Sequence, residues 1–117
     1  MRRMISDLVL ESDDFLDLPL SAQALYCHCV VSADNCGFFS NINTIKRMVG
    51  ATQDDVDALV RAGFLIRFPG TSTSCVKHWK MMNELKGKSE FPEAKLVRLN
   101  GGVYEFRLEE DDDENQL

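Results

Sequence analysis

This chain has two histidines and four cysteines, whose side chains could bind a zinc ion. Three of these six residues are consecutive, Cys27-His28-Cys29. Residues two apart on a helix lie about 200° around its axis, so Cys27 and Cys29 cannot easily bind one ion. The sequence has no Cys-x-x-Cys pair, and neither His28 nor His78 has an acid or nucleophile partner that the sequence identifies. The sequence therefore predicts small thiols lining a core, no enzyme, no metal site and no cofactor.

Lysine and arginine side chains can bind the phosphates of a nucleic acid, and they are unevenly distributed in this chain. Residues 1 to 57 hold four bases and nine acids, whereas residues 58 to 108 hold nine bases and four acids. Six more acids lie in the last nine residues, 109–117, and account for the net charge of −6. We therefore expect any positive surface in the C-terminal half, and a solvated, disordered acidic tail, although such a tail could also occupy a basic site of the same chain.

The candidate contacts to DNA differ in what they could recognise. Gln53 could read adenine and Arg61 guanine in a major groove. Asp54 and Asp57 lie on the same outward helix face as Gln53 and Arg61. Carboxylates at this end of a helix cap it and repel phosphate. We therefore prefer to interpret this face as solvated, not as one that reads bases. The other candidates would contact phosphates without reading sequence. They are Arg2, Arg3, Lys46, Arg47, Arg67, Lys77, Lys80, Lys86 and Lys88.

Two short helices joined by a sharp turn would position four of these candidates, Lys46, Arg47, Gln53 and Arg61. Apolar residues recur at helical spacing in 42–49 and again in 56–63, so each segment has one face for a core. Gly50 can take the left-handed conformation that ends the first helix, while Thr52 and Asp55 have the spacing of a capping box for the second. The two faces consist of Ile42, Ile45, Met48 and Val49, and of Val56, Leu59, Val60 and Gly63.

A β-hairpin is predicted directly after these helices. Residues 64–68 favour a strand, residues 69–73 supply turn chemistry, and residues 74–79 return as the partner strand. Trp79 could stack on a base beside Lys77, but a lone tryptophan in a small domain more often belongs to the core.

An earlier helix and two further strands complete the predicted fold. The helix takes its apolar stripe from Leu18 to Ala33 with Ser21 as N-cap, and Phe38-Phe39 fits a short strand. Residues 94–108 alternate around Gly101-Gly102, which predicts a terminal hairpin that either extends the sheet or pairs with another protomer. The predicted class is α+β: a winged helix-turn-helix, with a three-helix core and a β-hairpin wing, plus an added C-terminal β-hairpin. The expected boundaries are 1–83 for the winged-helix domain, 84–108 for the extension and 109–117 for the tail.

Length and composition suit one globular domain, because the chain has 117 residues and a hydrophobic content of 44%. The sequence contains no stretch long and apolar enough to span a bilayer, and its N-terminus lacks the apolar region of a secretory signal. We therefore expect a cytoplasmic protein that has no membrane partner and keeps its cysteines as thiols.

Several strings of the sequence carry a more specific likeness. They are the opening Met1–Ser6, the segment Ser12–Tyr26, the Gly50-Ala51 turn and Val76–Lys80. Together they resemble the N-terminal domain of phage replisome organisers, which are DnaD-like replication initiation proteins, over about residues 1 to 83. The resemblance implies a winged helix used in origin binding or self-assembly, with a helicase loader or helicase as partner. Those proteins usually continue into a longer C-terminal region, whereas this chain has the hairpin and the acids.

Two functions therefore remain open at this point. The first is a DNA-binding module of phage or prophage replication that contacts double- or single-stranded DNA mainly through phosphates. The alternative is a protein-interaction or oligomerisation module of a phage replication complex, without direct DNA binding. Its self-pairing edge would be the terminal hairpin with Val103, Tyr104 and Phe106, which would make a homo-oligomer. The acidic helix favours the second function, whereas the resemblance and the C-terminal basic excess favour the first.

Overall fold

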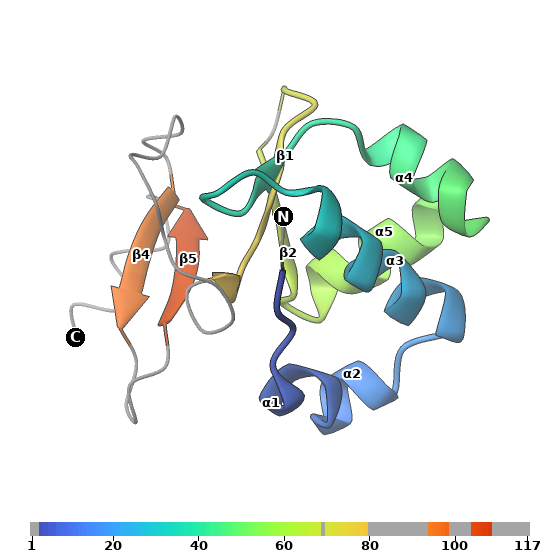
Figure 1. Ribbon diagram of the computed structural model, residues 1–117, viewed down its shortest axis with the longest axis horizontal. Coiled ribbons are helices and arrows are strands. Elements are labelled where there is room, and N and C mark those ends of the chain that lie inside the picture. The colour runs from blue at the N-terminus through green and yellow to red at the C-terminus, as the bar shows by residue number, and fades with distance from the viewer. Residues whose placement is uncertain (1–2, 69, 80–93, 99–103, 109–117) are drawn as a thin grey trace.

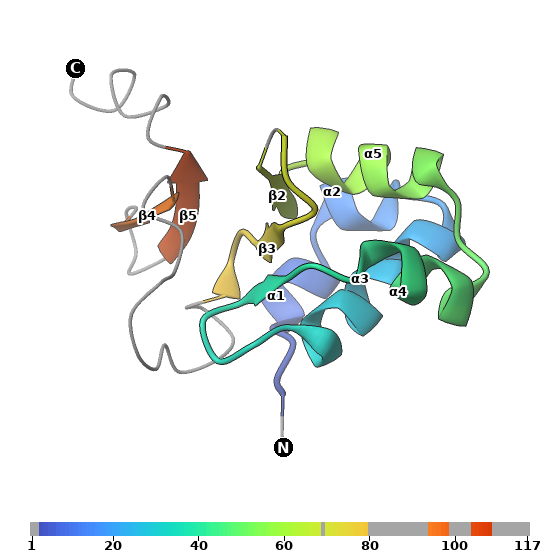
Figure 2. The same ribbon diagram turned by 90° about the horizontal axis from the view of Figure 1, so that it is seen from above.

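The structure is a computed structural model that describes residues 3–68, 70–79, 94–98 and 104–108 (Figure 1). Within these ranges, helices pack beside a small antiparallel sheet, so the predicted α+β class is confirmed (Figures 1 and 2). The helices are α1 (Asp7–Leu10), α2 (Asp13–Leu16), α3 (Leu20–Ser32), α4 (Ile42–Val49) and α5 (Gln53–Arg61). The strands are β1 (Phe38–Phe39), β2 (Leu65–Arg67), β3 (Ser74–Val76), β4 (Ala94–Arg98) and β5 (Tyr104–Leu108).

Helix α3 is the centre of the helical layer, since it packs against both α4 and α5. Its buried residues Ala22, Leu25 and Cys29 come from the predicted stripe. The predicted N-cap is wrong, because Pro19 holds that position and Ser21 already lies inside the helix. The Ser21 hydroxyl instead donates a hydrogen bond of 2.8 Å to Oδ1 of Asp55 on α5.

The turn between α4 and α5 follows the predicted chemistry. Gly50 ends α4 with a φ of 77°, in the left-handed region. The capping box of α5 is present, and the Thr52 N–H donates 2.9 Å to Oδ2 of Asp55. The apolar face predicted for α4 was too wide, because Ile42 and Ile45 are buried whereas Met48, in the last turn, is 58% exposed. Only the first part of α4 therefore faces the core.

The sheet has the strand order β1-β3-β2, and both pairings are antiparallel. Cys75 on the central strand stands opposite Phe38 on one side and Ile66 on the other. The short strand predicted at Phe38-Phe39 is confirmed. The strand predicted over 74–79 was too long, because Lys77 and His78 form a turn after β3.

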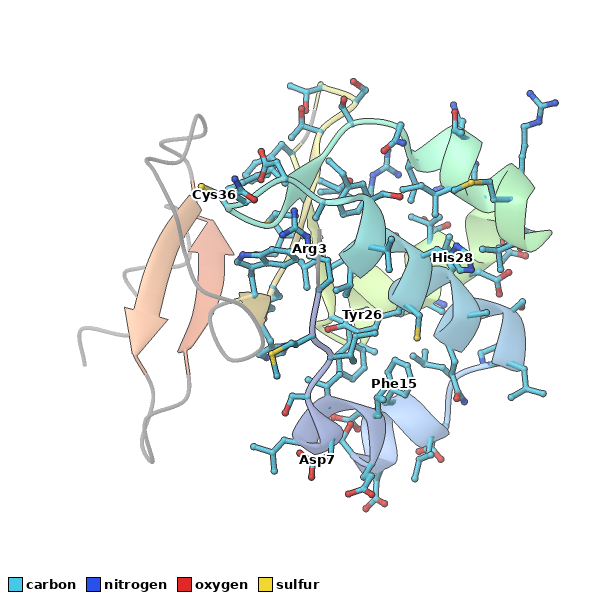
Figure 3. All side chains as sticks on the ribbon, viewed as in Figure 1. Arg3, Asp7, Phe15, Tyr26, His28 and Cys36 are labelled. Carbon is cyan, nitrogen blue, oxygen red and sulfur yellow. The ribbon has the colours of Figure 1, made fainter. Side chains whose placement is uncertain are left out.

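Two short helices before α3 bring an aromatic side chain into the core. The Ser12 hydroxyl accepts a hydrogen bond from the Phe15 N–H and caps α2. Phe15 then packs edge-to-face with Tyr26 and with Phe64, with ring centroids 5.4 Å apart in both pairs (Figure 3). This cluster connects α2, α3 and the chain that enters β2.

Strands β4 and β5 pair antiparallel as a separate two-stranded sheet, with Leu96 opposite Phe106. The Gly101-Gly102 loop predicted between them lies outside the described residues, as do the tail and residues 80–93. Among the residues that the structure describes, no helix is both long and apolar enough to cross a membrane.

Candidate nucleic-acid interface

The outward face of α5 is occupied by its own hydrogen bonds. The Lys46 ammonium on α4 donates 3.1 Å to Oε1 of Gln53, and Nε2 of Gln53 donates 3.1 Å to Oδ1 of Asp57. The donor and the acceptor with which Gln53 would read adenine are therefore both engaged within the protein. These bonds are solvent-exposed and weak, so a ligand could displace them, but the free protein does not present Gln53 ready for a base.

The N-terminus of α5 is closed by Asp55, whose side chain is only 6% exposed. Its carboxylate accepts hydrogen bonds from the Thr52 N–H and from the Ser21 hydroxyl. Asp54 in the same first turn is exposed and adds a second negative charge. A helix N-terminus attracts phosphate through its N–H groups and its positive dipole end, and the two carboxylates in the first turn of α5 oppose this attraction.

Among the predicted DNA contacts whose burial the structure describes, the exposed cations lie on three different elements. Arg47 is on α4, Arg61 is the last residue of α5 and Arg67 is the last residue of β2. Lys77, after β3, is only half-exposed, and its ammonium lies 3.7 Å from the position that a Cβ on Gly63 would take. It therefore lies near the C-terminal end of α5, where a cation is favourable. The candidates Arg2, Lys80, Lys86 and Lys88 lie outside the described residues.

Arg3, one of the predicted phosphate contacts, makes contacts within the protein. Its Nη2 donates 2.9 Å to the carbonyl oxygen of Ala33 and 3.4 Å to Oδ1 of Asn35. Its guanidinium carbon also lies 5.2 Å from the ring centroid of Trp79. These contacts hold the N-terminal segment against the loop that follows α3, so the guanidinium is already engaged.

Trp79 belongs to the core and cannot stack on a base, because its side chain is 0% exposed. Its Nε1 donates 3.2 Å to the carbonyl oxygen of Asn35. The core interpretation of this residue is thus confirmed. The contribution of Asn35, which accepts hydrogen bonds from both Trp79 and Arg3, was missed.

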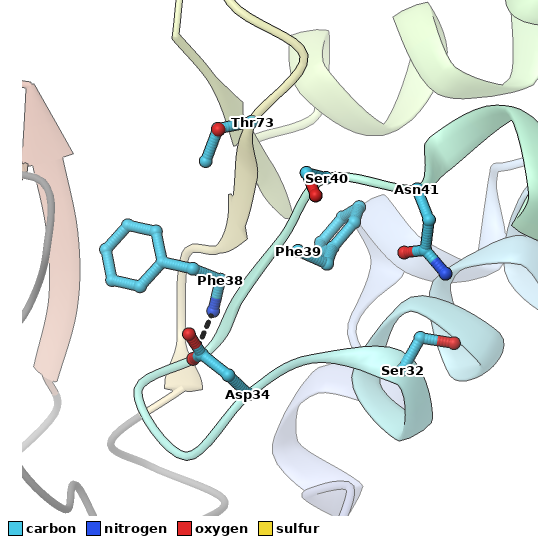
Figure 4. Close-up of a pocket in the computed structure, with 7 residues that line it drawn as sticks. All are labelled: Ser32, Asp34, Phe38, Phe39, Ser40, Asn41 and Thr73. Carbon is cyan, nitrogen blue, oxygen red and sulfur yellow. Dashed lines mark hydrogen bonds between the residues drawn. The ribbon is translucent and has the colours of Figure 1, made fainter.

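A cavity of about 390 Å³ lies where α3 ends, β1 passes and α4 begins (Figure 4). Asp34 at its rim is turned toward the backbone, since Oδ1 accepts hydrogen bonds from the N–H groups of Cys36 and Phe38. The cavity contains none of the predicted site residues, and no sequence signal marks it. Its lining consists of Ser32, Asp34, Phe38, Phe39, Ser40, Asn41 and Thr73.

The cysteines are buried to different degrees, and all four are free thiols. Burial raises the pKa of Cys29 to about 12, and it raises the pKa of Cys75 still further, with the nearby Asp34 carboxylate adding to the effect. Cys27 is half-buried, and burial raises its pKa to a smaller degree. Within the described ranges, no three His, Cys, Asp or Glu side chains are grouped as for a metal ion.

We expect iodoacetamide at pH 8 to modify Cys27 first and to leave Cys29, Cys36 and Cys75 unmodified until the protein unfolds. The thiolate is the reactive form, and burial both removes the thiolate and blocks access. Mass spectrometry of alkylated peptides over time measures the order of reaction. In urea all four should react together, and equal rates in the native protein would contradict the observed burial.

Comparison of this chain with known proteins identifies no relative. The sequence matches no protein-family model, and neither a curated protein nor a solved structure is significantly similar to it.

Proposed function

We propose that the protein is a winged helix-turn-helix module that binds DNA through phosphate contacts, of the type found in phage and prophage replication initiation proteins. The order of elements supports this proposal. Helix α3 supports α4 and α5, which meet at the Gly50 turn, and β2 and β3 form an antiparallel hairpin with the third strand β1 at its side. In this proposal β4 and β5 are an added C-terminal hairpin.

The observation that carries the proposal is the distribution of charge on and around α5. Carboxylates lie at the N-terminus of the helix, and exposed arginines lie elsewhere. The helix N-terminus, which would approach phosphate or bases, is filled by Asp55 and flanked by Asp54. Exposed arginines are found instead on α4, at the end of α5 and on the β2 strand of the wing. Binding through such cations positions the protein on DNA without reading its sequence, so affinity should depend steeply on salt and weakly on sequence.

Fluorescence anisotropy of labelled duplex and single-stranded oligonucleotides across a salt series tests this function. We expect binding whose salt slope falls by about one unit in Arg47→Gln and again in Arg67→Gln. Gln53→Ala is the matched control on α5, because a phosphate-only mode leaves its affinity unchanged. A loss of affinity in Gln53→Ala that depends on the oligonucleotide sequence would instead indicate base reading.

The protein-interaction module is the second candidate, and exposed apolar side chains favour it. Leu8, Leu16 and Leu20 are 68%, 57% and 81% exposed on α1, α2 and α3. Contiguous patches of exposed apolar side chains mark surfaces that bind another protein, and these three leucines lie on consecutive helices. If no oligonucleotide binds at low salt, this candidate replaces the first.

A further inference from the structure

Helix α3 has a second apolar stripe, on the side that faces away from the core. Residues spaced alternately four and three positions apart lie along one side of a helix. Four apolar residues have this spacing on the side opposite the buried residues of α3, and we call them the outer stripe: Leu20, Ala24, Cys27 and Val31. Leu20 and Val31 are 81% and 66% exposed, and the two smaller side chains between them are half-buried.

The outer stripe is free of charged residues, and within the described part of the chain no element covers it. Helix α5 lies behind α3 in Figure 1, and Figure 2 shows the same order from above, so the outer stripe faces the viewer of Figure 1. Residues 18–33 contain no Asp, Glu, Lys or Arg, and the exposed His28 lies at the margin of the stripe. By contrast, Arg47 is exposed on α4 and Asp54 on α5. Surface helices normally have polar residues opposite their core face, so the outer stripe is suited to burial against another surface.

The outer stripe is complementary to itself when two copies of α3 run antiparallel. Its large side chains, Leu20 and Val31, lie at the two ends, and its small side chains, Ala24 and Cys27, lie between them. A two-fold axis midway along the stripe places Leu20 of one copy against Val31 of the other, and Ala24 against Cys27. The small residues let the two helices approach closely, and the dipoles of antiparallel helices attract each other.

We propose that two copies of this chain form a dimer through antiparallel packing of their outer stripes. A second copy fits this face because the stripe meets no like charge when it packs against itself, and large and small side chains alternate correctly between the copies. From Leu20 to Val31 the helix rises only about 16 Å. A helix pair of this length buries less than the roughly 800 Å² per partner of a standard interface, so we expect a dissociation constant of about 10 to 100 µM. The dimer does not depend on the proposed DNA binding.

Sedimentation equilibrium of the full chain at increasing protein concentration tests the dimer. We expect Leu20→Glu and Val31→Lys each to weaken association more than about tenfold, because each would bury an unpaired charge in the interface. Leu8→Glu is the matched control, because Leu8 is 68% exposed on α1, outside the stripe. A native chain that stays monomeric up to about 1 mM would overturn the proposal. An effect of Leu8→Glu as large as that of the stripe variants would also overturn it.

An equimolar mixture of Leu20→Glu and Val31→Lys tests the orientation of the helices. In an antiparallel dimer the mixture pairs the introduced carboxylate with the introduced ammonium at one end, and Val31 with Leu20 at the other. At low salt the mixture should therefore associate at least about tenfold more tightly than either variant alone. In a parallel dimer both charges would face apolar side chains, so a mixture that does not recover association would overturn the antiparallel packing.

Cys27 gives a readout in the native chain that needs no substitution. Its reaction with iodoacetamide at pH 8 should slow as the protein concentration rises through the range in which the dimer forms, because the partner's stripe covers the thiol. Mass spectrometry of the alkylated peptides measures this rate. A dimer in which Cys27 reacts as fast as in the monomer would overturn the proposal and would show that the copies associate through another surface.

Discussion

Gly37→Ala is expected to lower the free energy of unfolding by about 3 to 5 kcal/mol, which is a large part of the stability of a typical small domain. Gly37 has a φ of 90°, which an L side chain rarely adopts. A Cβ at this position would also lie 2.7 Å from Cγ and 2.9 Å from Cβ of Trp79. The overlap involves the inner atoms of a fully buried indole, which cannot move aside without displacing the core.

Gly50→Ala is the matched control for this experiment. Gly50 also has a left-handed φ, 77°, but nothing lies within 4 Å of a Cβ built there. Its substitution therefore measures the backbone strain alone, about 1 kcal/mol. Urea denaturation of the two variants separates strain from overlap, and a Gly37→Ala variant as stable as Gly50→Ala would show that the indole does not pack as described.

The Trp79 cluster also shows why part of the fold could be predicted and part could not. Gly50 and the Thr52–Asp55 capping box were predicted because the groups that they contact are close in sequence. Arg3 donates a hydrogen bond to Ala33, which is 30 residues away in sequence, and Trp79 donates one to Asn35, which is 44 residues away. No local pattern selects such partners, so Arg3 was assigned to phosphate as any N-terminal arginine would be.

The same argument applies to the candidate interface. The acidic character of α5 was predicted from composition, and the structure adds which carboxylate is buried and which is exposed. The engagement of Gln53 by Lys46 depends on how α4 and α5 cross, which the periodicity of each helix alone does not specify. The register of β2 decides which of its residues bond to β3, and a one-residue shift would turn the N–H and C=O groups of Ile66 away from β3 in place of those of its neighbours.

Asp55→Ala is expected to lower the free energy of unfolding by about 2 to 3 kcal/mol, the second largest effect. Asp55 caps α5 through the Thr52 N–H, and it joins α5 to α3 through the Ser21 hydroxyl, 34 residues away in sequence. Alanine would leave the Thr52 donor and the Ser21 hydroxyl without their acceptor in a part-buried position, and the cap and the helix contact would be lost together.

Two further variants separate these contributions in urea denaturation. Asp54→Ala removes an exposed carboxylate from the same helical turn and should change the stability by less than about 1 kcal/mol. Ser21→Ala removes only the contact between α3 and α5, so it should cost about 1 kcal/mol, and its effect should disappear when Asp55 is already alanine. Additive effects of the Ser21 and Asp55 substitutions would show that the hydroxyl does not depend on this carboxylate. Within the described residues, carboxylates at the N-terminus of α5 leave the exposed arginines as the groups that would contact phosphate in the proposed function.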